Sequence, residues 1–125
     1  MKSEIDGQWA LVKLTSSWSD ELRTYDATSL DGEPVITLHK GRFVQSWNDH
    51  DTVFFRVDPT QDPKQIILYS NESRSIASIV GYGIYLLDAN ELTIRLDLDR
   101  PTDFTLGVGL TGSLARYAKI EHLEN

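Results

Sequence analysis

Residues 91–98 constrain the fold of this chain more than any other segment. Leucine or isoleucine occupies positions 92, 94, 96 and 98, and polar residues lie between them. A period of two is typical of a strand with one face in a core and one in water. Residues 83–88 precede this strand through Ala89-Asn90, so the sequence predicts a β-hairpin with a tight turn.

Other β-prone runs follow one another along the chain, separated by turn residues. They cover residues 7–15, 34–39, 42–47, 52–57, 65–69, 76–87 and 114–123. Together with the strand at residues 91–98 they give about eight strands and almost no helix, the pattern of an all-β, antiparallel up-and-down barrel. Residues 16–33 break the pattern, and we expect a long loop there with one helical turn near residues 20–25. Residues 48–51 are expected to form a polar turn.

Composition limits the classes of protein to which the chain can belong. A length of 125 residues fits one domain, spanning residues 1–125. The absence of cysteine excludes disulfides and cysteine-based metal sites. The net charge of −7, with scattered basic residues, argues against nucleic acid and anionic membranes as partners. No run of apolar residues has the length of a signal peptide or membrane span, so we expect a soluble, cytoplasmic protein.

Two sets of residues resemble known proteins. Trp9, in Gly7-Gln8-Trp9, and Arg116 are similar to the Gly-x-Trp and late arginine of lipocalins, in which the arginine packs across the tryptophan and closes one barrel end. A wider set of segments matches one family, namely residues 7–9, 31–34, 43, 57–59, 63–66, 83–88, 92–96 and 100–104. Through these segments the chain resembles a family of small lipocalin-like domains of unknown function that is abundant in planctomycete bacteria. Asp97 stands where we expect a cysteine in that family. The resemblance implies a lipocalin-like barrel and a bacterial source, and no activity.

The densest cluster of charges comprises Asp97, Asp99, Arg100 and Asp103. Asp97 and Asp99 point to the same side of a strand and could begin a site for a hard cation such as Ca²⁺. Ion pairs from Arg100 to Asp99 or Asp103 explain the same residues, so we interpret Arg100 and Asp103 as structural closure, along with Trp9 and Arg116. We predict no metal ligands and no cofactor. No nucleophile and base at a recognisable spacing point to an enzyme.

Aromatic residues are the strongest indication of binding. Phe54 and Phe55 are consecutive, so they point to opposite faces of one strand. One of them faces outward, toward a partner or under a cover formed by residues 16–33. The predicted ligand or partner contacts are Trp18, Trp47, Phe54, Phe55 and Tyr85.

Eight strands enclose an interior that is either filled by side chains or able to hold one small ligand. Our leading hypothesis is therefore non-catalytic binding of a small, mainly apolar molecule inside the barrel, entered near residues 16–33. The alternative is a protein-interaction or inhibitor module with a filled barrel. These hypotheses differ in whether Leu92, Ile94 and Leu96 meet bulky side chains across the interior.

Overall fold

A computed structural model of the protein describes residues 4–17, 23–26, 35–45, 48–98, 101, 103–104 and 112–120, without the side chains of residues 17, 23, 25–26 and 48–52. This part of the chain is almost entirely extended, and no helix in it is long and apolar enough to cross a membrane. Its elements are β1 (Gly7–Ser17), β2 (Arg23–Asp26), β3 (Val35–His39), β4 (Arg42–Gln45), β5 (Asn48–Asp58), β6 (Lys64–Tyr69), the 3₁₀-helix η2 (Ile76–Ser78), β7 (Ile79–Asp88), β8 (Glu91–Asp97) and β9 (Gly112–Lys119).

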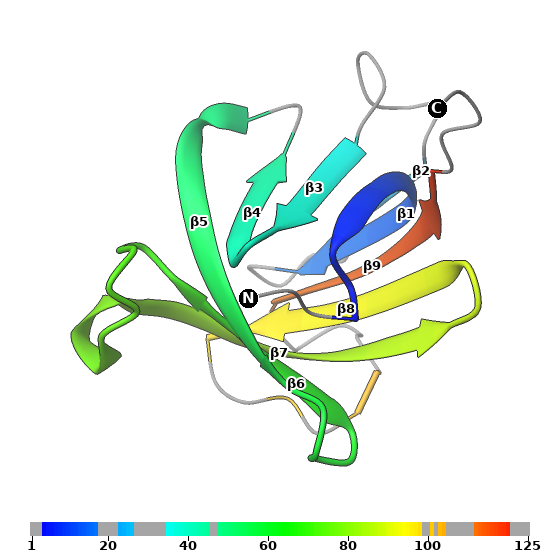
Figure 1. The fold of residues 1–125 in the computed structure, drawn as a ribbon. Coiled ribbons are helices and arrows are strands. Elements are labelled where there is room, and N and C mark those ends of the chain that lie inside the picture. Colours follow the sequence, from blue (N-terminus) through cyan, green and yellow to red (C-terminus); the bar gives the residue numbers. More distant parts are fainter. Residues whose placement is uncertain are drawn as a thin grey trace.

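The strands close into a barrel. From β3 to β9 each strand pairs antiparallel with the next, and β9 pairs with β1, which also pairs with β3 (Figure 1). β2 pairs with the second half of β1, on the edge whose first half pairs with β3. The barrel therefore has eight strands, with β2 as an added ninth, and the predicted all-β antiparallel architecture is confirmed.

The predicted hairpin is present as β7 and β8, joined at Ala89-Asn90. Leu92 and Ile94 lie in the core as expected, but Leu98 lies beyond the end of β8 and is 64% exposed. The polar face also differs from the prediction, because Arg95 is only 4% exposed. Its guanidinium donates to the Leu96 carbonyl oxygen at 2.6 Å and to an Asp97 carboxylate oxygen at 3.3 Å, so these partners replace water.

Two segments expected to be turns or loops are strands. Ser16 and Ser17 continue β1, and residues 23–26 form β2 where a helical turn was predicted. The predicted polar turn at residues 48–51 is the beginning of β5. Local propensity was misleading at both places because strand formation depends on a partner edge, which β1 and β4 supply.

A β-bulge in β1 sets which of its side chains face inward. The register with β9 shifts between Leu11 and Lys13. Before the bulge Trp9 and Leu11 point into the barrel, and after it Leu14 packs against the core. One extra residue thus changes the alternation from odd to even positions.

Phe54 and Phe55 lie on opposite faces of β5, as predicted. Phe55 is in the core, whereas Phe54 is partly buried on the outside. Its cover is Arg74, whose guanidinium lies 5.6 Å from the centre of the Phe54 ring. Arg74 also donates to the carbonyl oxygens of Phe55 (3.2 Å), Gly41 (2.9 Å) and Glu72 (2.9 Å). It therefore fastens the segment between β6 and β7 to the turn between β3 and β4.

Candidate functional site

The interior of the barrel is filled at one end and hollow at the other. A cavity of about 170 Å³ lies inside, and its wall runs from β8, β9 and β1 across to β4. Six of the lining side chains are large and apolar or aromatic, and the others are alanine, serine or glutamine. The lining residues are Leu11, Leu14, Ser16, Phe43, Gln45, Ile94, Leu96, Ser113, Ala115 and Tyr117.

Small side chains on β9 explain why space remains. Ala115 lies opposite Leu14 of β1 and Ile94 of β8, and Ser113 lies opposite Ser16 and Leu96. Short inward side chains on β9 and β1 leave a volume that the facing Phe43 and Gln45 do not fill. Toward the other end, the inward positions of the same strands carry Trp9 and Leu92, both fully buried.

The part of the cavity lining that the structure describes is electrically neutral. None of its ten side chains carries a formal charge, and the polar atoms come from Ser16, Gln45, Ser113 and Tyr117. Burial raises the pKa of the Tyr117 phenol well above its usual value, so this hydroxyl stays protonated at neutral pH. Such a site suits an uncharged molecule, since a charge moved there from water would find no opposite charge among these ten side chains.

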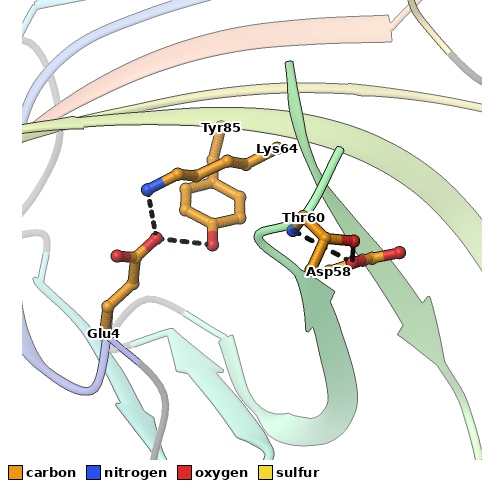
Figure 2. Close-up of polar contacts among 5 residues, drawn as sticks. All are labelled: Glu4, Asp58, Thr60, Lys64 and Tyr85. Carbon is orange, nitrogen blue, oxygen red and sulfur yellow. Dashed lines mark hydrogen bonds and ion pairs between the residues drawn. The ribbon is translucent and has the colours of Figure 1, made fainter. Parts of the chain in front are cut away.

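The filled end is closed by residues just before β1. Ile5 is fully buried in the core, and its carbonyl oxygen accepts a hydrogen bond from the Trp9 indole at 3.0 Å. Glu4 precedes Ile5, and Figure 2 shows one of its carboxylate oxygens accepting hydrogen bonds from Lys64 Nζ and from the Tyr85 hydroxyl, each 2.8 Å long. These contacts anchor the N-terminal segment to β6 and β7.

The Glu4 contacts also shift two pKa values. The hydrogen bond from Lys64, followed by that from Tyr85, holds the pKa of Glu4 below its usual value. Burial, followed by the bond to the Glu4 carboxylate, raises the pKa of Tyr85. Both groups are thus kept in the forms they have at neutral pH, which fits a structural role.

Asp58 organises the neighbouring turn between β5 and β6. One of its carboxylate oxygens accepts hydrogen bonds from the Thr60 backbone N–H at 3.1 Å and hydroxyl at 2.5 Å, as Figure 2 shows. The other oxygen accepts from Gln61 at 3.2 Å. The hydrogen bonds from Thr60 are the main reason that the pKa of Asp58 lies below its usual value. We interpret this cluster as a turn, because its acceptors are all used locally.

The predicted pairing of Trp9 with Arg116 is wrong. Arg116 alternates with the inward residues of β9, so its side chain is exposed, where it lies 4.0 Å from a Glu91 carboxylate oxygen. Lys119 takes its place, with Nζ 4.8 Å from the centre of the Trp9 ring and 3.2 Å from the Asp6 carbonyl oxygen. Of the other two predicted closure residues, Asp103 is exposed and Arg100 lies outside the described residues.

None of the five predicted contact residues lines the cavity within the described part of the chain. Phe55 and Tyr85 belong to the packed core, Phe54 lies on the outer face, and Trp18 and Trp47 fall outside the description. Sequence reasoning chose large aromatic residues and missed the small inward residues that create the space. The sequence of residues 113–117 could have identified these small inward residues, because alternation along a strand places Ser113, Ala115 and Tyr117 on one face.

No group of three histidine, cysteine, aspartate or glutamate side chains able to hold a metal ion occurs among the described residues. Leu96 and Ile94 border open space, while Leu92 is fully packed, so the barrel is neither wholly filled nor wholly hollow.

No protein-family model, curated protein or solved structure matches the chain.

Proposed function

We propose that this barrel binds a small, mainly apolar molecule without transforming it. The observation that carries the proposal is the cavity of about 170 Å³ between Phe43, Ile94 and Ala115. Its size is close to that of an apolar cavity of roughly 150 Å³ that binds benzene or xenon. A ligand of monocyclic size would gain from leaving water for contact with the apolar side chains of the wall.

Toluene is a suitable first probe because it has an apolar ring and no charge. Toluene would be added stepwise while the amide chemical shifts of the protein are recorded. We expect the shifts of residues around the cavity to change and those of residues at the filled end near Trp9 to stay the same. Native mass spectrometry of protein purified gently from its own cells would then show whether a natural ligand remains bound.

A matched pair of variants tests the location. Ala115→Leu places a larger side chain in the cavity, whereas Ala118→Leu makes the same change on the exposed face of β9. We expect Ala115→Leu to weaken toluene binding at least tenfold and Ala118→Leu to leave it unchanged. Binding that survives in Ala115→Leu, or no binding of toluene to the wild-type protein, would refute the proposal.

Protein interaction is a second candidate, supported by a different observation. Ile76 is 87% exposed, Leu98 is 64% exposed and Val80 is 49% exposed. Exposed large apolar side chains are typical of interaction surfaces when they lie together. If these side chains contribute to a protein interface, Val80→Ser with Leu98→Ser should abolish a complex that Ala115→Leu retains.

A further inference from the structure

We infer that the ligand of this cavity is a small neutral molecule with an apolar body and one hydrogen-bond acceptor, held by the hydroxyl of Tyr117. The inference rests on the proposed function and adds the chemical class of the ligand. It depends on the position of Tyr117, on its lack of a hydrogen-bond partner and on the neutrality of the lining.

Tyr117 projects inward from β9, between Leu11 of β1 and Leu92 of β8. The residue is only 5% exposed and forms part of the cavity wall. Its side chain therefore contacts the cavity while remaining shielded from the outer solvent.

The Tyr117 hydroxyl has no hydrogen-bond partner among the described residues. Within the same residues, every fully buried side-chain nitrogen or oxygen atom does have one. The hydroxyl must therefore border accessible space, and Tyr117 lines the cavity described above. Buried polar groups are nearly always satisfied, so an open donor in the wall of this cavity is a site for a ligand atom.

Tyr85 provides the contrast within this barrel. It is buried too, but its hydroxyl donates to the Glu4 carboxylate at 2.8 Å. The two inward tyrosines thus differ in one respect that matters for binding, since Tyr85 is satisfied by the protein and Tyr117 is not.

The acceptor on the ligand is uncharged. Burial keeps the Tyr117 phenol protonated, so it can donate but cannot balance the charge of an anion. Among the described lining residues there is no cationic side chain that would replace the hydration of a carboxylate or phosphate. A ketone, ester or ether oxygen meets these requirements.

Three probes with one phenyl ring and the same number of non-hydrogen atoms separate these features. Acetophenone has a neutral acceptor, α-methylstyrene has none, and benzoate has a charged one. Dissociation constants would be measured by amide chemical-shift titration for the wild-type protein, for Tyr117→Phe and for Tyr85→Phe. The Tyr85 variant controls for the loss of a buried hydroxyl away from the cavity, and the amide spectra show that each variant is folded.

We expect Tyr117→Phe to weaken acetophenone binding roughly two- to twelvefold, the range that corresponds to one net hydrogen bond. Binding of α-methylstyrene should not weaken in this variant, and Tyr85→Phe should change neither constant. Benzoate should bind the wild-type protein at least tenfold more weakly than acetophenone.

Equal effects of Tyr117→Phe on acetophenone and α-methylstyrene would overturn the inference while leaving the proposed function intact. Binding of benzoate as tight as that of acetophenone would overturn it as well. Failure of all three probes to bind the wild-type protein would instead overturn the proposed function, and the inference with it.

Discussion

Filling the cavity should stabilise the protein, and the substitution Ala115→Leu tests this directly. Ala115 lies in the cavity wall, with Leu14 and Ile94 beside it on the neighbouring strands. A cavity of about 170 Å³ has room for the larger side chain without displacing its neighbours. The sign of the change in stability therefore reports whether the space exists.

The magnitude follows from the atoms added. Leucine adds three carbon atoms to the alanine side chain, and burial stabilises by about 0.8 kcal/mol per methylene-sized group, or roughly 2.4 kcal/mol in all. Ordering the leucine side chain opposes this by about 0.5–1 kcal/mol. We expect the free energy of unfolding of Ala115→Leu to rise by about 1.5 kcal/mol.

Urea unfolding at equilibrium, with the transition analysed as two-state, measures this difference. Ala118→Leu is the matched control, since Ala118 is exposed on the same strand, and it should change the free energy by less than about 0.5 kcal/mol. If the interior were filled, Ala115→Leu would overpack it and destabilise the protein by about 1–3 kcal/mol. A loss of that size would refute the reasoning on which the cavity and the proposed function rest.

Three further perturbations test contacts elsewhere in the barrel. Arg74→Ala should lower the free energy of unfolding, measured by urea unfolding, by about 2–3 kcal/mol, because it removes hydrogen bonds to three carbonyls and a ring contact. Arg56 is exposed, and Arg56→Ala is the control. Equal effects of the two substitutions would contradict the prediction. Lys119→Met should lower the thermal midpoint of unfolding more than Arg116→Ala does, since Lys119 and not Arg116 lies over the Trp9 ring. The reverse order would support the predicted packing of Arg116 on Trp9. Stability measured from pH 7 to 3 should reveal the carboxylate of Glu4. Its contribution is complete above the unfolded-state pKa, near 4.5, and is lost as pH falls through the lower folded-state pKa. Glu4→Gln should remove this part of the pH dependence, and an unchanged profile would exclude the proposed anchor.

A hollow region in a small barrel is a departure from the close packing that most cores achieve. Natural proteins retain such departures when function requires them, and substitutions that remove them often stabilise the fold at the expense of activity. The prediction for Ala115→Leu has both parts, because the variant should gain stability and lose the ability to bind toluene. Observation of both effects would link the cavity to function more strongly than either alone.

Local sequence pattern determined the strands and turns whose signals are contained in neighbouring residues. Alternation identified β8, and Ala89-Asn90 marked the hairpin turn that the structure contains between β7 and β8. Phe54 and Phe55 had to face opposite sides because consecutive side chains of a strand always do. The number of strands then predicted closure into a barrel, since an open sheet of this size would leave unpaired edges.

Tertiary structure decided everything that depends on residues distant in the chain. Arg95 is buried and Leu98 exposed, although alternation predicts the opposite, because burial depends on what packs against each face. Lys119 rather than Arg116 reaches Trp9, because the register of β9 turns Arg116 outward. The cavity belongs to the same class of feature. It exists because side chains of several strands meet across the barrel without filling it. Its volume depends on the sizes of all these side chains and on how the strands close, and no single stretch of sequence contains that information.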